Sequence, residues 1–178
     1  MMKREKLNSV LVAGIVVLVL AACGHGHGGG GTAQQPTTAV IKLGTSGTMD
    51  PGILIGAIDI AAVLPAGVTL KSVPDSINTG VFLTDDGVVT ATGAAGMGTT
   101  ALSGVYTAAT STEAGIVRIV LVNVPGFGIG EFCTVNADIA ADAVVTAVDI
   151  VSLATFTVRD ESGNVISGIT PTFEAVLL

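Results

Sequence analysis

Two acidic turns carry the side chains that are best suited to chemistry in this sequence. Asp85 and Asp86 precede a glycine, and Asp160, Glu161 and Asn164 lie within five residues of one another. Carboxylate and amide oxygens are the ligands that Ca²⁺ prefers, and one loop can supply several of them. Neither segment has the spacing of an EF-hand loop, and acidic turn tips are more often simply solvated. Calcium binding by these five residues is therefore a hypothesis, and no other cofactor is expected.

The histidines exclude one large class of enzymes. His25 and His27 are the only two in the chain, and both lie in a glycine-rich segment near the start. No histidine is therefore available later in the chain to activate a serine or cysteine nucleophile. The sequence has no GxSxG motif, and the glycines of GAAGMG and GFGIG have the wrong spacing for a dinucleotide-binding loop.

Carboxylate pairs, which glycoside hydrolases use, are the remaining catalytic option. Candidates for such a pair are Asp85, Asp86, Asp138, Asp142 and Asp149. Clefts that bind sugars usually offer aromatic platforms, and this chain has no Trp and a single Tyr. We predict that the protein is not an enzyme and has no catalytic residues.

The first 22 residues have the pattern of a secretion signal. Lys3, Arg4 and Lys6 come first, and the uncharged apolar run 10–22 follows. This run is shorter than the roughly 20 residues that a helix needs to cross a membrane. We therefore predict a cleaved signal peptide over residues 1–22 rather than a permanent span.

The end of this run, Leu20-Ala-Ala-Cys23, resembles the lipobox of bacterial lipoproteins. The resemblance implies cleavage before Cys23 and acylation of that cysteine, for example with palmitate. Acyl chains anchor a protein because each CH₂ group buried in the bilayer contributes about 0.8 kcal/mol to membrane binding. Gly24 in place of aspartate implies a cell outer membrane location, with the periplasmic and external faces both open. The alternative is an ordinary signal peptide followed by a stray cysteine.

Residues 23–39 follow as a predicted flexible linker. GHGHGGGG holds six glycines in eight residues, and such a composition behaves as a flexible coil. His25 and His27 offer neither the ligand count nor the rigidity of a metal site.

Residues 40–178 form one predicted all-β domain. The segment is rich in Val, Ile, Thr and Gly, with turn residues at short intervals, a composition that favours strands. The predicted strands are 53–64, 67–73, two short strands around Asp85-Asp86-Gly87, 115–124, 131–140 and a final strand, turn and strand with its tip at 160–164. The segment 137–152 is expected to form strand, bulge and strand, with a helical turn near 140–143 as the alternative.

The burial of two of these strands can also be predicted. Residues 115–124 are apolar except for Arg118 and Asn123, which predicts a strand buried on both sides for much of its length. In 131–140, apolar and polar residues alternate, so that Cys133 is expected to face the core. With Cys23 acylated, Cys133 has no partner within the chain, and no disulfide is expected.

The segments PGFGIGEFCTVNADI and AVVTAVDIVSLATFTVRDESGNVISGI resemble the second half of a cohesin-type domain. IGAIDIAAVLPAGVTLKSV is similar to an earlier strand of that family, although Leu64-Pro65 stands where the family usually has Tyr-Asp. The resemblance implies an antiparallel jelly-roll β-sandwich, related in topology to some carbohydrate-binding modules, that acts by binding. No residue of this chain matches a dockerin contact.

Charge narrows the class of partner. After residue 22, four basic residues stand against thirteen acidic ones, a net charge of −9 that repels nucleic acid. We therefore expect a membrane-anchored, noncatalytic module that binds a protein or assembles at the surface through a sheet face. Polysaccharide binding is one alternative, although Tyr106 and five Phe offer a weak platform. Self-assembly into an envelope structure is the other, because the mean hydropathy of +0.77 indicates apolar contacts.

Overall fold

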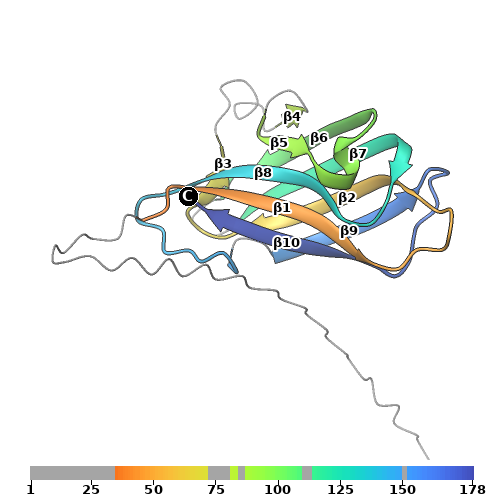
Figure 1. Cartoon of the computed structure of the whole chain (residues 1–178). Helices are drawn as coiled ribbons and strands as arrows, with labels where there is room; N and C mark the ends of the chain where they lie inside the picture. The colour runs from red at the N-terminus through yellow and green to blue at the C-terminus, as the bar shows by residue number, and fades with distance from the viewer. Residues whose placement is uncertain (1–34, 72–80, 84–86, 110–113, 150–151) are drawn as a thin grey trace, which may run out of the picture. The chain divides into compact units, whose positions relative to one another are not determined.

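The computed structural model describes residues 35–71, 81–83, 87–109, 114–149 and 152–178. In these ranges the protein is all-β, with two antiparallel five-stranded sheets and no α-helix. The two sheets pack face to face around one apolar core, as in a β-sandwich (Figure 1). This confirms the predicted all-β, antiparallel class. The described part of the chain contains no helix with the length and apolar character of a membrane span.

Sheet A contains the first and the last strand of the chain. Its order is β10-β1-β8-β3, and β5 pairs with β8 on the same side as β3, further along the strand. The five strands are β1 (Thr38–Gly47), β3 (Val68–Leu70), β5 (Val89–Ala91), β8 (Glu131–Ile139) and β10 (Ile169–Leu177).

Sheet B contains the longest strand, β7, at its centre. Its order is β4-β6-β7-β2-β9. The five strands are β2 (Ile55–Leu64), β4 (Val81–Leu83), β6 (Thr100–Thr107), β7 (Gly115–Phe127) and β9 (Ser152–Asp160). A short 3-10 helix, Gly93–Gly96, lies between β5 and β6.

Strand β8 has the predicted alternation. Cys133, Val135 and Ala137 are buried in the core, which confirms that Cys133 faces inward. Phe132 has the opposite parity and is buried as well. The register between β8 and β1 shifts beside Phe132, so a β-bulge turns this extra residue inward.

Strand β7 differs from its predicted burial. The structure buries only one side of it: Val117, Ile119 and Leu121 lie in the core. On the other side, Ile116, Val120, Val122 and Val124 are exposed to solvent. Aliphatic residues stand on both sides of this strand, which is why the sequence predicts burial on both sides. In the structure, no described residue covers the outer side.

The segment 140–149 is not the predicted strand, bulge and strand. Strand β8 ends at Ile139, and the chain then makes turns closed by the amide of Ala143 on the oxygen of Ala140 and the amide of Asp149 on the oxygen of Thr146. Val144 is 89% exposed. The β-branched residues have no neighbouring strand here to pair with, so their β propensity is not expressed.

The final strand, turn and strand are present, but the two strands belong to different sheets. After β9, a turn at Asp160–Gly163 brings Val165 into a single bridge with Arg159. The chain then crosses from sheet B to sheet A and enters β10. The two short strands on either side of Gly87 are also divided between the sheets: β4 joins sheet B and β5 joins sheet A.

The end of β1 depends on a glycine. Gly47 has a φ of +126°, and a Cβ placed on it would lie 2.1 Å from the backbone oxygen of Gly168. Any side chain at this position would force apart the ends of β1 and β10. Gly128, in the β7–β8 turn, has no atom within 4 Å of the corresponding position.

We therefore predict that Gly47→Ala lowers the free energy of unfolding by more than about 2 kcal/mol, through positive-φ strain and backbone overlap. The matched change Gly128→Ala should stay within about 0.5 kcal/mol of the wild type. Urea unfolding of both variants measures the difference. Equal losses in the two variants would contradict the assigned crowding at Gly47.

Candidate functional site

The predicted site residues fall into two groups. Cys23, Asp85 and Asp86 lie outside the described residues. Asp160 is the last residue of β9, and Glu161 and Asn164 follow it in an exposed turn.

Asp160 closes this loop by its own hydrogen bonds. One carboxylate oxygen, Oδ1, accepts hydrogen bonds from the amides of Ser162 at 2.9 Å and Asn164 at 2.8 Å. The other, Oδ2, accepts one from the side-chain amide of Asn164 at 3.0 Å. These bonds, those from Asn164 first, hold the pKa of Asp160 below its usual value. Both oxygens therefore serve to shape the turn.

Glu161 does not join Asp160. Its carboxylate lies against Gly126 at the end of β7 instead. Among the described residues, no three His, Cys, Asp or Glu side chains gather as a metal site would require. Calcium binding by this loop stays a prediction, to which this geometry adds no support.

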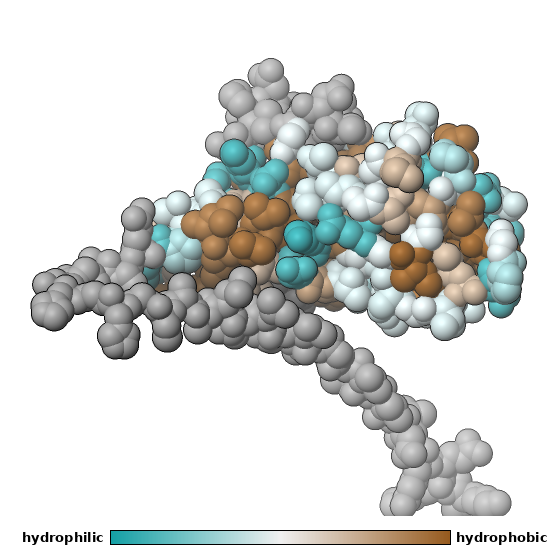
Figure 2. All heavy atoms as spheres, in the orientation of Figure 1, coloured by the Kyte–Doolittle hydropathy of each residue, from teal (hydrophilic) through white to brown (hydrophobic). Residues whose placement is uncertain are grey.

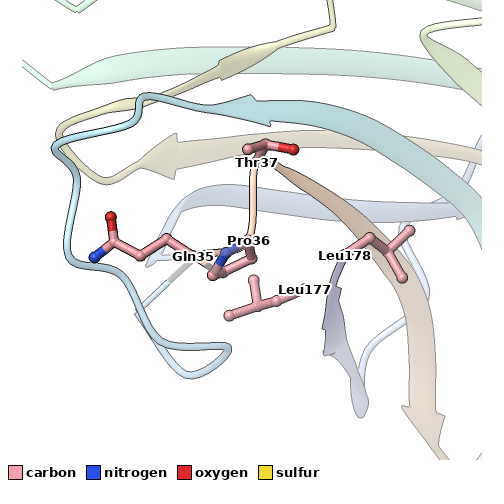
Figure 3. Close-up of a pocket in the computed structure, with 5 residues that line it drawn as sticks. All are labelled: Gln35, Pro36, Thr37, Leu177 and Leu178. Carbon is pink, nitrogen blue, oxygen red and sulfur yellow. The ribbon is translucent and has the colours of Figure 1, made fainter. Parts of the chain in front are cut away.

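A hollow lies where the described chain begins and ends. It has a volume of 530 Å³ and is lined by Gln35, Pro36, Thr37, Leu177 and Leu178 (Figure 3). The amides of Thr37 and Thr38 both donate to the oxygen of Leu178, at 2.9 and 3.2 Å. The hollow is wide open, and none of the five residues that line it has an ionisable side chain.

The outer face of sheet A is mostly polar. Lys42 on β1 lies beside Glu174 on β10 and Thr134 on β8, and Asn136 shares their face. Figure 2 views the protein from this side and shows hydrophilic and intermediate residues across its middle, with hydrophobic residues towards the end that carries the C-terminus. Val40 and Val176 are paired at that end.

The outer face of sheet B is mostly apolar. Strands β7 and β2 present mostly aliphatic side chains along it, β6 contributes Ala101 and Val105 together with Ser103 and Thr107, and β9 adds threonines. The exposed or half-buried aliphatic residues are Val63, Val105, Ile116, Val120, Val122 and Val124. We call this surface the B face. It is the feature that sequence reasoning missed.

One signal in the sequence marks the B face. Arg118 has the same parity as Ile116, Val120 and Val122 within β7. A buried strand rarely places an unpaired guanidinium in the core, so the parity of Arg118 indicates which side of the strand is exposed.

An ion pair lies at the middle of the B face. Asp59 on β2 and Arg118 on β7 are diagonal neighbours across the sheet. The guanidinium donates two hydrogen bonds, from Nε to Oδ1 at 3.0 Å and from Nη2 to Oδ2 at 2.5 Å. The bidentate pair fixes both side chains in orientation, since two parallel bonds set the angle as well as the distance.

The pair changes the protonation of both groups. The hydrogen bond from Arg118 and the positive charges of Arg118 and Arg159 lower the pKa of Asp59, against a smaller opposing effect of burial. The same contact raises the pKa of Arg118. Both groups are therefore charged at neutral pH.

A second arginine borders the same surface. Arg159 pairs with Ala57 across β2 and β9, and its Nη1 donates to the oxygen of Gly163 at 2.9 Å. A shallow hollow of 180 Å³ lies between Ala57, Asp59, Val120, Thr157 and Arg159. Both arginines of the domain, Arg118 and Arg159, thus border the B face of an acidic protein.

No protein-family model, no curated protein and no solved structure matches this chain.

Removing Arg118 should raise the pKa of Asp59 towards its ordinary value of 3.8. In the wild type the folded-state pKa is the lower one, so the stabilisation by this carboxylate is complete above pH 3.8 and is lost as the pH falls through the folded-state value. ¹³C NMR titration of the Asp59 carboxyl in wild type and Arg118→Gln measures the shift. An unchanged pKa in the variant would contradict the assigned hydrogen bonds.

Cys133 should be unreactive in the folded protein. It is a free thiol with no exposed surface, and burial raises its pKa, so almost no thiolate forms. We expect the full chain carrying Cys23→Ser to react with a thiol reagent only in denaturant. Stoichiometric labelling under native conditions would contradict the burial of Cys133.

Proposed function

We propose that the protein is a noncatalytic binding module of the cell envelope, anchored through Cys23, that binds a protein partner through the B face. In this proposal residues 1–22 are a signal peptide, residues 23–39 a linker and residues 40–178 the binding domain. The observation that carries the proposal is the contrast between the two outer faces, one polar and one aliphatic.

Surface chemistry supports a protein as the partner. Contiguous exposed apolar patches on soluble proteins usually mark contact surfaces. The aliphatic part of the B face is formed mainly by Val and Ile on paired strands, and β-branched side chains in strands have few rotamers to lose on binding. The surface is also broad rather than deep, as protein interfaces usually are.

The polysaccharide alternative has less support. Sugars stack on exposed aromatic rings. Phe127 and Phe132 are buried, and Tyr106, Phe156 and Phe173 pack against the core. No described aromatic side chain lies on either outer face.

The finer assignment of the fold belongs to the same proposal. We propose that the two antiparallel sheets form a cohesin-like jelly roll, as the sequence resemblance implies. The face-to-face packing of two five-stranded antiparallel sheets is consistent with it.

Two matched substitutions test the B face as the binding surface. Val122 on the B face is 43% exposed, and Val176 on the outer face of sheet A is 40% exposed. We expect full-length Val122→Lys to recover at least tenfold less of a partner protein from envelope extracts than wild type does, because the new charge must be desolvated on binding. Val176→Lys should recover as much as wild type.

Quantitative affinity purification with the three baits makes this comparison, and thermal melts check that all three are folded. Equal recovery by Val122→Lys and wild type would contradict the proposal. Equal loss in both lysine variants would contradict it as well, because the effect would then not belong to the B face.

A further inference from the structure

We infer that the protein bound at the B face is a second copy of this chain, packed face to face about a two-fold axis beside the Asp59–Arg118 pair. This inference rests on the proposed function and adds the identity of the partner. Two observations carry it: the arrangement of charges on the B face and the size of that face.

The charges on the B face are self-complementary. In an interface with two-fold symmetry, each residue contacts the counterpart of its own neighbour. Asp59 and Arg118 lie side by side on adjacent central strands and are held in fixed orientation by two hydrogen bonds. A two-fold axis midway between them brings Asp59 opposite Arg118 of the second copy, and Arg118 opposite its Asp59.

This exchange forms a group of four alternating charges. Each carboxylate then faces two guanidinium groups, and each guanidinium two carboxylates. Along β2 and β7 the described side chains beside the pair are aliphatic, with Ile116 and Val63 on one side and Val120 and Val122 on the other, while β9 places Thr157 beside Asp59. Apolar surface therefore meets apolar surface on both sides of the axis.

The size of the B face fits a stable dimer. Four strands at about 4.8 Å spacing and about 33 Å of strand length give a face of about 600 Å². Two such faces together bury about 1,200 Å², the lower end of the range for specific protein interfaces. The outer face of sheet A has similar dimensions, but Lys42, Glu174 and Thr134 occupy its middle, and its paired aliphatic residues Val40 and Val176 lie at one end.

Because the chain is acidic, the positions of its arginines indicate which surfaces of two copies can approach each other. Residues 23–178 carry a net charge of −9, so two such copies repel each other over most of their surfaces. The B face is different, because Arg118 and Arg159 outnumber the single carboxylate of Asp59 there. Repulsion is therefore weakest when the two B faces meet.

A charge-swap experiment tests the inference on the full chain. Two copies with different affinity tags are co-expressed, extracted in mild detergent, purified through one tag and probed for the other. Wild-type copies should co-purify. Asp59→Arg paired with itself brings four positive groups together, and Arg118→Asp paired with itself brings four negative groups together, so both should lose at least tenfold in recovery.

The decisive sample combines the two variants. When one copy carries Asp59→Arg and the other Arg118→Asp, opposite charges face each other again, and we expect recovery to return to within about threefold of wild type. Neither substitution touches the core, and thermal melts confirm folding. Val122→Lys should abolish co-purification and Val176→Lys should leave it unchanged.

The outcomes separate this inference from the proposed function. Wild-type copies that do not co-purify, or a mixed pair that is not restored while both variants are folded, would overturn the second copy as partner. Suppose that the second copy is overturned as the partner, but Val122→Lys still recovers less of a different protein from envelope extracts than wild type does. The proposed function then stands without the inference. If Val122→Lys changes neither result, both fail.

Discussion

The packing of one side of each sheet against the other is the constraint on which the rest of the structure depends. The described chain has no disulfide and one free, buried cysteine, so the two sheets are held by side-chain packing and strand pairing alone. Away from β-bulges such as the one at Phe132, strand geometry allows each strand to send only alternate residues into that core. The remaining residues there must face outward, whatever their chemical type. The character of the two outer faces therefore follows from what the chain places at the remaining positions.

The two sheets use these outer positions differently. In sheet A, the outward residues of β1, β8 and β10 are mostly polar or charged, as expected for a surface in water. In sheet B, aliphatic residues occupy most positions on both sides of β7, and the ion pair of Asp59 with Arg118 lies among those on the outer side. Exposed Val and Ile favour strand formation, but Thr, which is β-branched and polar, favours it as well. Strand formation alone does not explain the aliphatic choice, whereas the proposed contact surface would.

The sequence predicts local features of this fold better than long-range ones. The parity of β8 is predictable because Thr134 and Asn136 alternate with apolar residues, and the turn at Asp160 because its residues favour a turn. Aliphatic residues on both sides of β7 conceal which side is buried. The choice of sheet for β9 and β10 depends on packing between distant segments, so it has no local signal. The same holds for Asp59 and Arg118, which are separated by 59 positions and meet only through the register of β2 with β7.

The junction at Thr37 also determines how the domain resists mechanical force. A pull on the chain before Thr37 enters β1, which is hydrogen-bonded to β10 on one side and β8 on the other along its length. Both neighbours are antiparallel to β1, so tension along its axis loads many of these bonds together in shear. The bonds from Thr37 and Thr38 to Leu178 take up the load first. This geometry suits the proposed arrangement, in which the domain is anchored before β1 and binds through a sheet face.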